Sequence, residues 1–323
     1  MNIGIIGTGA YGIALAIHAI KNNNKVTMWT KFDDEYNMLK ESHKNIKALP
    51  NTTIPKEIMI TLDLKKCIQN KDLIILAIPS NSYEEVCENM QQYINKNQII
   101  CIASKGITSS NQLLNAIVEK YLKNDIVILS GPSFAIDLIE DHPIGLTLAS
   151  KDISCCNQME EYLSNQNVCF DITSDVQGVQ ICGVIKNIFA IGSGILEGLN
   201  CLDSTKAAYL TRCIEEIKQI ICSLGGEENT TFLYCGIGDL ILTCGSQKSR
   251  NFSYGKLIGE NANTDDIEIF ENNNLIEGLT ALTGIYPLVN QKSTQILSLI
   301  YDIVYNKKDP HILLNFIHNK SKI

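Results

Sequence analysis

The sequence predicts two domains: an α/β domain with a mostly parallel sheet over residues 1–174, and an all-α domain over residues 175–323. Three observations support this division. The chain has 323 residues, enough for about two domains at roughly 150 residues each. In the first half, short apolar runs alternate with helix-length connections, which is typical of parallel strands covered on both faces. After about Ser174 such runs become rare, and segments with helical periodicity replace them.

Seven apolar runs flanked by turn residues are predicted to be strands. They cover residues 2–6, 25–30, 72–78, 98–103, 125–129, 143–149 and 168–173. A helix is predicted from about Tyr11 to Lys21, directly after the first run. In the second half, helices are predicted over residues 176–199, 204–224 and 294–305.

The composition excludes several classes of protein. The formal net charge of -8 argues against nucleic acid or an anionic membrane as the main partner. The most apolar region, residues 176–196, is interrupted by Lys186, so no integral membrane segment is expected. The first Lys or Arg is Lys21, which does not fit a secretory signal. We therefore expect a soluble protein with a small-molecule substrate.

The cysteines indicate a reducing compartment. None of the 12 cysteines forms a C-x-x-C pair, and the adjacent Cys155 and Cys156 do not have the usual spacing of metal ligands. We expect reduced thiols, no metal and a cytoplasmic location. The terminal Ser321-Lys322-Ile323 differs by one residue from a peroxisomal address, and we interpret it as accidental.

A glycine-rich turn links the first predicted strand to the first predicted helix. Gly7, Gly9 and Gly12 have the spacing G-x-G-x-x-G. In this setting the first glycine allows a tight turn, the second leaves room for a pyrophosphate, and the third lets helix and strand approach. The helix N-terminus also favours phosphate. The motif predicts dinucleotide binding in a Rossmann-type domain, with a merely structural turn as the alternative.

The end of the second predicted strand bears on the cofactor. NAD-selective domains usually place Asp or Glu there to hold the ribose 2′-hydroxyl. Here the strand ends in Trp29-Thr30-Lys31, and Asp33 and Asp34 follow. Lys31 could attract a 2′-phosphate, which favours NADPH or the use of both cofactors. A solvated loop lysine is the alternative interpretation.

Three further loops follow predicted strands, at residues 78–80, 103–106 and 130–135. The carboxyl ends of parallel strands form the ligand crevice of an open sheet, so these loops are expected to converge there. Lys105 would be a cation facing that crevice, although a solvated surface lysine fits the sequence as well.

Lys186 lies within a helix that is apolar nearly all round, with Ile185, Ile188 and Phe189 beside it. A lysine in such a helix either extends its head to solvent or faces a polar cavity. Desolvation lowers the pKa of a buried lysine, which suits a proton donor to a carbonyl. Catalysis and simple exposure of the ammonium both remain open from this pattern alone.

A second polar cluster follows at Gly236–Cys244 and Ser249–Asn251. Asp239 stands among apolar residues, and a buried carboxylate needs a partner, for which Lys186 is a candidate. Arg250 suggests an anion clamp, because a guanidinium matches phosphate oxygens. A helix-capping aspartate and an exposed arginine are the alternative interpretation.

Together, these blocks closely resemble the NAD(P)-dependent glycerol-3-phosphate dehydrogenases of the bacterial biosynthetic type. The resemblance covers nearly the whole chain. Its blocks are GTGAYGIALA at the start, ASKGI around Lys105, SGPSFA at residues 130–135, VIKNIFAIGSGI around Lys186, GIGDLILTC around Asp239, SRN at 249–251 and LIEG at 275–278. One departure is Ala10, where the family commonly has serine.

The resemblance implies reversible reduction of dihydroxyacetone phosphate to sn-glycerol 3-phosphate for glycerophospholipid synthesis, with NADH or NADPH, in a homodimer without a metal. It implies that Lys186 is the general acid and that Asp239 orients it. The implied substrate-binding residues are Lys105, Gly131, Ser133, Lys186, Asn187, Asp239, Thr243, Ser249, Arg250 and Asn251. The implied cofactor-binding residues are Gly7, Gly9, Ala10, Tyr11, Gly12, Lys31, Lys105, Ala135, Arg250, Leu275 and Glu277.

Two alternatives remain at this stage. One is a related reductase that acts on another keto acid, similar to a ketopantoate reductase; the Arg250 clamp argues against it, since it favours a phosphorylated substrate. The other is a non-catalytic dinucleotide-binding protein, which would not need Lys186 or Asp239.

Overall fold

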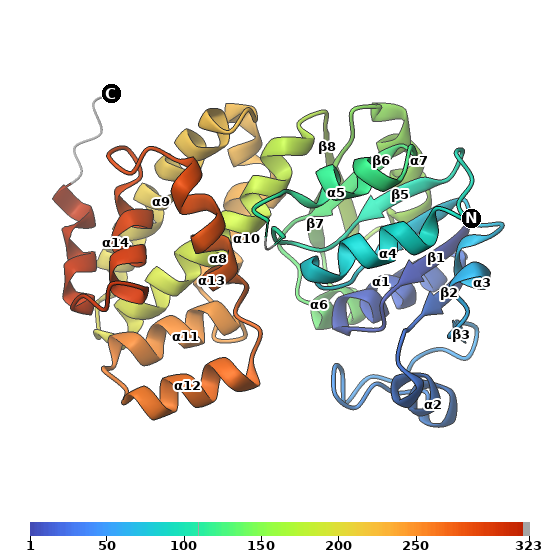
Figure 1. Ribbon diagram of the computed structural model, residues 1–323, viewed down its shortest axis with the longest axis horizontal. Helices are drawn as coiled ribbons and strands as arrows, with labels where there is room; N and C mark the ends of the chain where they lie inside the picture. Colours follow the sequence, from blue (N-terminus) through green and yellow to red (C-terminus); the bar gives the residue numbers. More distant parts are fainter. Residues whose placement is uncertain (109, 319–323) are drawn as a thin grey trace. The chain divides into compact units, whose positions relative to one another are not determined.

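The computed structural model describes residues 1–108 and 110–318 (Figure 1). The chain divides into two compact units. Unit 1 consists of Met1–Thr108 and Gln112–Val176, and unit 2 of Ser109–Asn111 and Gln177–Ile323. Unit 1 is the α/β part and unit 2 is helical, so the predicted fold class is confirmed. The terminal Ser321-Lys322-Ile323 lies outside the described residues.

Within the described residues, unit 1 is built on an eight-stranded sheet with the order β3-β2-β1-β4-β5-β6-β7-β8. The strands are β1 (Asn2–Ile6), β2 (Lys25–Trp29), β3 (Met59–Thr61), β4 (Leu73–Leu76), β5 (Ile99–Ile102), β6 (Ile126–Ser130), β7 (Ile144–Ala149) and β8 (Val168–Thr173). The pairing of β6 with β7 is antiparallel, and the other pairs are parallel. The strand order reverses between β1 and β4, which is where open sheets of this kind bind ligands.

The strand β3 was absent from the sequence-based prediction. It has three residues and pairs with β2 at the edge of the sheet. Met59 is 58% exposed, so the segment shows neither the apolar run nor the length by which the other strands were identified.

Helices cover both faces of this sheet. Ile3 and Ile5 of β1 share a core with α1 (Ala10–Lys21), α6 (Ala135–Ile139) and α7 (Ile153–Leu163). Gly4, which points to the opposite face, lies against the backbone of α3 (Leu64–Ile68). The remaining helices of the unit are α2 (Asp33–Ser42), α4 (Tyr83–Met90) and α5 (Leu114–Tyr121). Successive side chains of a strand point to opposite faces of the sheet, and helices cover both faces. Every residue along such a strand is therefore buried, which explains the continuous apolar runs in the sequence.

Unit 2 is organised around α8 (Val176–Gly198). The other α-helices in the described part of the unit are α9 (Asp203–Ser223), α10 (Asp239–Cys244), α11 (Arg250–Gly259), α12 (Thr264–Asn273), α13 (Glu277–Ile285) and α14 (Gln295–Val304), shown in yellow to red in Figure 1. Among the described residues, α8 alone is long and apolar enough to cross a membrane, and the 18-residue apolar window within it is fully buried. It is therefore the core helix of this unit, and it carries Lys186.

Two glycines bring α8 and α11 into close backbone contact. A Cβ atom at Gly194 would lie 2.0 Å from the Phe252 carbonyl oxygen, and one at Gly255 would lie 1.9 Å from that of Ile191. Any side chain at either position would collide with the backbone of the other helix, so this crossing requires glycine at both positions. This crossing fixes the start of α11, with Arg250 and Asn251, relative to the Lys186 segment of α8.

Candidate active site

The glycine-rich turn of unit 1 has the geometry of a phosphate-binding loop. Gly7 has φ = 115°, and a Cβ there would lie 2.4 Å from the Ala77 carbonyl oxygen. A Cβ at Gly12 would lie 2.5 Å from the Gly7 carbonyl oxygen. Gly7 thus permits the turn, and Gly12 permits helix and strand to approach.

Gly9 differs from these two glycines, because a Cβ built on it would meet no described atom within 4 Å. Gly9 is the N-cap of α1, and no side chain caps that helix end. The first-turn N–H groups are therefore positioned to receive an anion beside open space. The residues of this turn fit the pyrophosphate of a dinucleotide.

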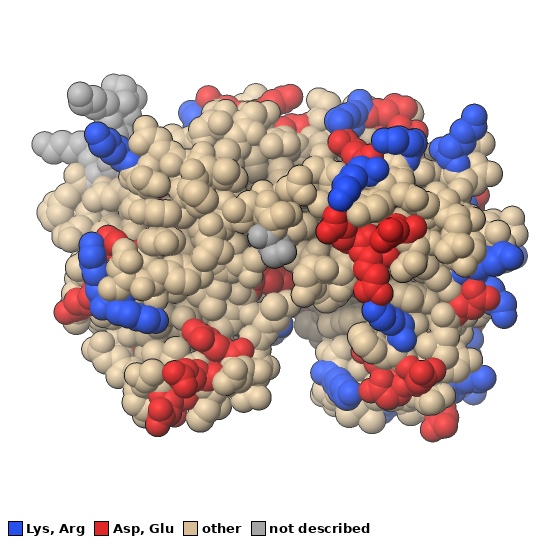
Figure 2. Space-filling model, in the orientation of Figure 1, with Lys and Arg blue, Asp and Glu red and all other residues tan. Residues whose placement is uncertain are grey.

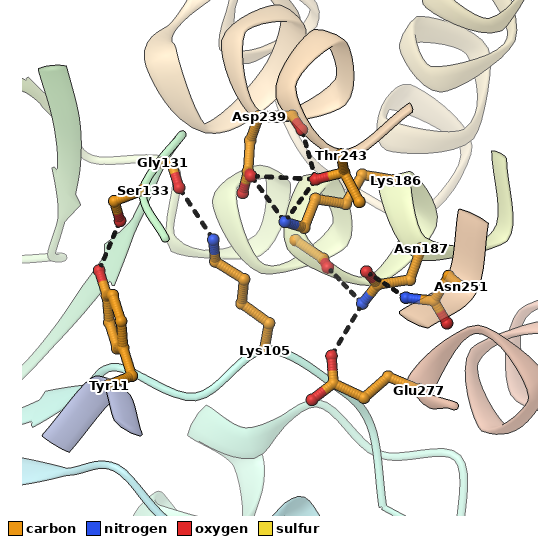
Figure 3. A network of polar contacts seen from close by, with 11 residues as sticks. Tyr11, Lys105, Gly131, Ser133, Lys186, Asn187, Asp239, Thr243, Asn251 and Glu277 are labelled. Carbon is orange, nitrogen blue, oxygen red and sulfur yellow. Dashed lines mark hydrogen bonds and ion pairs between the residues drawn. The ribbon is translucent and has the colours of Figure 1, made fainter. Parts of the chain in front are cut away.

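The loops after β4, β5 and β6 converge as the sequence predicted. Ser104 donates a hydrogen bond to the Ile78 carbonyl oxygen at 2.7 Å, and Lys105 Nζ donates to the Gly131 carbonyl oxygen at 2.9 Å. Tyr11 of α1 hydrogen bonds to Ser133 at 2.9 Å between the hydroxyl oxygens (Figure 3). The carboxyl edge of the sheet is therefore a connected polar surface that includes four predicted site residues. Ala10 and Ala135 begin α1 and α6 beside it.

Glu35, in the first turn of α2, is a residue of this edge that the sequence analysis missed. Its Oε2 accepts hydrogen bonds from Thr8 at 2.5 Å and from Thr30 at 2.7 Å. Thr8 lies between Gly7 and Gly9, so this carboxylate is fixed beside the glycine-rich loop. The available signal was an acidic residue about 20 residues after the motif, but only Asp33 and Asp34 were noted there and no ribose-binding role was assigned.

Lys31 lies at the same corner, with its ammonium 2.6 Å from Glu85 Oε1 of α4. Both side chains are more than half exposed. The structure thus places Lys31 in a surface ion pair, an arrangement that neither sequence-based interpretation included.

In unit 2, Lys186 is buried and paired. The residue is 8% exposed, and its Nζ donates to Asp239 Oδ1 at 2.6 Å and to Thr243 Oγ1 at 2.9 Å (Figure 3). Asp239 is 1% exposed and begins α10. Thr243, one turn later, donates its hydroxyl proton to the Asp239 carbonyl oxygen at 2.7 Å. The expected Lys186–Asp239 pair is therefore present, and the ammonium does not reach solvent by extending along the helix.

A chain of amides lies next to this pair. Asn187 Nδ2 donates to Glu277 Oε2 at 3.1 Å, and Asn187 Oδ1 accepts from Asn251 Nδ2 at 2.9 Å. Asn251 Oδ1 in turn accepts from the Gly278 N–H at 2.9 Å. The contacts join α8, α11 and α13, and they explain why Asn187, Asn251 and Glu277 are found together (Figure 3).

The remaining predicted residues of unit 2 lie in different environments. Ser249 is the N-cap of α11, and its hydroxyl accepts from the Phe252 N–H at 3.3 Å. Arg250 follows it as an exposed residue of the first turn. Leu275, just before α13, is 55% exposed. Hydrogen bonds thus hold Ser249 and Asn251 within the unit, whereas Arg250 and Leu275 present their side chains at its surface.

The glycine-rich loop at the carboxyl edge of a parallel sheet and the buried lysine–carboxylate pair define the class: the protein is an NAD(P)-dependent oxidoreductase. Sequence profiles make the assignment specific. Residues 2–156 match the N-terminal part, and residues 175–315 the C-terminal part, of NAD-dependent glycerol-3-phosphate dehydrogenase. The chain belongs to this family.

Individual relatives agree with the profile match. The glycerol-3-phosphate dehydrogenase [NAD(P)+] of Thermoanaerobacter sp. (strain X514) is 34% identical over 314 residues, covering 96% of this chain and 94% of the relative. That of Fusobacterium nucleatum is 35% identical over 283 residues, covering 86% and 84%. The crystal structure of glycerol-3-phosphate dehydrogenase from Coxiella burnetii superposes with a TM-score of 0.89 at 28% identity and 99% coverage of both chains.

Proposed function

We propose that the protein reduces dihydroxyacetone phosphate to sn-glycerol 3-phosphate, reversibly, with NADH or NADPH, and so supplies glycerophospholipid synthesis. The observation that carries this proposal is the buried Lys186, held by Asp239 and Thr243 in a chain of this family. The relatives from Thermoanaerobacter and Fusobacterium nucleatum, which are named glycerol-3-phosphate dehydrogenase [NAD(P)+], support the same reaction. It is favoured over a ketopantoate-like reduction and over a non-catalytic role.

The proposed chemistry divides between the residues of the two units. When bound, the reduced nicotinamide supplies a hydride to the carbonyl carbon of the substrate. Lys186 Nζ gives a proton to the carbonyl oxygen, so that a C–OH bond replaces the C=O bond, and it recovers a proton from water afterwards. Asp239 and Thr243 fix the direction of the ammonium. In the reverse direction the neutral amine accepts the hydroxyl proton.

The proposal assigns the other residues by their position. The domain at residues 1–174 binds the dinucleotide through its glycine-rich loop, with Tyr11, Lys105 and Ser133 on the connected edge. The helical domain at residues 175–323 carries the proton donor. Its Asn187 keeps a carboxamide beside that donor, since Asn251 and Glu277 hold both ends of the side chain.

Arg250 is proposed to bind the substrate phosphate. It stands at the N-terminus of α11, where the helix dipole and the guanidinium both favour an anion. Substitution Arg250→Ala is expected to raise the KM for dihydroxyacetone phosphate by about tenfold or more, because a charge-assisted bond is lost. Arg212→Ala is the control, since Arg212 pairs with Glu215 on α9. An unchanged KM in Arg250→Ala would contradict the clamp.

The decisive experiment follows the absorbance of reduced nicotinamide with the purified protein, dihydroxyacetone phosphate, and NADH or NADPH in parallel. Oxidation with the phosphorylated substrate, and none with dihydroxyacetone, supports the reaction and the phosphate requirement together. Turnover of ketopantoate instead would overturn the proposal in favour of the related reductase.

Two further properties are proposed on the same basis: a homodimer and a cytoplasmic location. Light scattering of the purified protein tests the first, and cell fractionation tests the second. A monomer at working concentration, or recovery with membranes, would overturn them separately.

A further inference from the structure

The corner between β2 and α2 is acidic, although it contains Lys31. The first turn of α2 carries Asp33, Asp34 and Glu35. Asp34 pairs with Lys47 at 3.1 Å. The chain's arginines are Arg212 and Arg250, so unit 1 contains no guanidinium at all. The cations found at this corner are lysines, Lys31 and Lys47, and a 2′-phosphate would depend on them for its attraction.

Lys31 is already paired with a carboxylate of another helix. Glu85 lies in the first turn of α4 and accepts from Lys31 Nζ at 2.6 Å. Figure 2 shows acidic side chains gathered over α4, which carries Glu84, Glu85 and Glu88. A phosphate close to Lys31 would also be close to Glu85, so much of the attraction would be cancelled.

Glu35 supplies the opposite preference. Its Oε2 is fixed by the hydroxyls of Thr8 and Thr30, which holds the carboxylate next to the glycine-rich loop. Among the residues that the structure describes, none hydrogen bonds to its Oε1. In dinucleotide-binding domains an acidic residue about 20 residues after the glycine motif accepts the ribose 2′-hydroxyl, and Glu35 follows Gly12 by 23 residues. It would repel a 2′-phosphate, which carries up to about two negative charges.

We propose that Glu35 is a specificity-determining residue that selects a dinucleotide with a free 2′-hydroxyl, and that Glu85 reinforces this choice by holding Lys31. The enzyme therefore prefers NADH to NADPH. This inference rests on the proposed function, because it requires the dinucleotide to bind at the glycine-rich loop.

Isothermal titration calorimetry of the full chain with NADH and with NADPH tests the inference without turnover. We expect the dissociation constant of NADH to be lower than that of NADPH by a factor of about ten or more. ADP-ribose and its 2′-phosphorylated form should show the same order, since the preference resides in the adenosine half. Equal affinity, or tighter binding of NADPH, overturns the inference and leaves the proposed reaction intact. Binding of neither cofactor overturns both.

Three substitutions locate the preference. Glu35→Gln keeps an acceptor for Thr8 and Thr30 but removes the charge, so the ratio of the two dissociation constants should fall several-fold toward unity. Glu85→Gln should strengthen NADPH binding and leave NADH binding unchanged, because it releases Lys31. Glu84→Gln is the matched control. Glu84 is adjacent to Glu85, but its carboxylate accepts from Lys120 and Tyr121 and not from Lys31, so the affinity for neither cofactor should change.

The outcomes separate a specificity role from a structural one. If Glu35 only holds Thr8 in place, Glu35→Gln weakens both cofactors equally and the ratio stays constant, which would overturn the assignment. If Glu35→Gln does not fold, the ratio in the wild-type protein and its change in Glu85→Gln decide the question.

Discussion

One ion pair of unit 2 and two ion pairs of unit 1 differ sharply in their exposure to solvent. In unit 2, Lys186 and Asp239 form a pair that is nearly excluded from solvent. In unit 1, Lys31–Glu85 and Lys120–Glu84 are pairs in which every side chain is more than half exposed. Water screens the exposed pairs, and their removal costs little. A buried pair depends on its partner, because a single charge left behind has no compensation. Unit 2 is therefore suited to hold a reacting group, and the exposed charges of unit 1 are suited to discriminate between ligands.

The largest expected effect is that of Lys186→Met. We expect kcat to fall by about 10²–10⁴-fold, because the proton donor is lost. The free energy of unfolding should fall by about 3–5 kcal/mol, because Asp239 remains buried without its cation. Binding of NADH by calorimetry should be nearly unchanged. A variant that keeps more than about a tenth of the wild-type kcat would contradict the acid–base role.

The double variant Lys186→Met, Asp239→Leu separates the two losses. Replacing both members of a buried pair with apolar side chains is often neutral for stability, so chemical denaturation should show most of the unfolding free energy restored. Activity should remain as low as in the single variant. Recovery of activity with stability would show that Lys186 acts only in folding.

Glu216 offers a second buried charge in unit 2. Both carboxylate oxygens cap α14, accepting from the N–H groups of Ile296 at 2.9 Å and Leu297 at 2.8 Å. Burial raises the pKa of Glu216 to about 7, against the two backbone hydrogen bonds, which lower it. With the pKa raised in the folded state, its stabilising contribution is complete below the unfolded pKa of about 4.5 and is lost as the pH rises through about 7.

Substitution Glu216→Gln should therefore remove this part of the pH dependence. The quantity to follow is the difference in unfolding free energy between the wild type and the variant. This difference should decrease by about 3 kcal/mol as the pH is raised from 4.5 to 8. A constant offset is also expected, because a carboxamide can accept only one of the two N–H bonds well. Denaturation at several pH values measures the difference. A difference independent of pH would show that Glu216 titrates normally.

The parts of the fold that the sequence predicted are those with a strong local pattern. The continuous apolar runs of β1, β4 and β5 are buried on both faces of the sheet, so their identification was direct. The strand β3 is short and lies at the edge, and β7 runs antiparallel to β6 although its apolar run resembles those of the parallel strands. Strand direction is a tertiary property, which local periodicity does not contain.

The candidate site shows the same division. The Lys186–Asp239 pair could be expected, because two buried ionisable residues need partners and few were available. The exposed pair of Lys31 with Glu85 could not be expected from the sequence. The two residues are 54 positions apart, and water could solvate each charge without a partner. Glu35 was missed for a related reason: which of three consecutive acidic residues faces the loop depends on where α2 begins.

Two glycines of unit 1 should respond differently to the same change. Gly12→Ala should lower the free energy of unfolding by about 1–3 kcal/mol, because the new methyl group would lie 2.5 Å from the Gly7 carbonyl oxygen. Gly9→Ala meets no described atom, so its stability should change by less than about 1 kcal/mol. Gly9→Ala should instead weaken NADH binding, since the methyl group occupies the space proposed for the pyrophosphate. Equal effects on stability would contradict this assignment of the two positions.

The smallest effect is expected from the exposed ion pair between Lys120 and Glu84. In the pair Lys120–Glu84, the hydrogen bond and the ammonium lower the pKa of Glu84, and the carboxylate raises that of Lys120. Because the pKa of Glu84 is lowered, the pair contributes above the usual pKa of a glutamate and its contribution is lost on acidification. Water surrounds both groups, so Lys120→Met should leave the melting temperature at pH 7 within about 2 °C of the wild type. A decrease in melting temperature as large as that of Lys186→Met would show that burial does not account for the difference between the Lys186–Asp239 and Lys120–Glu84 pairs.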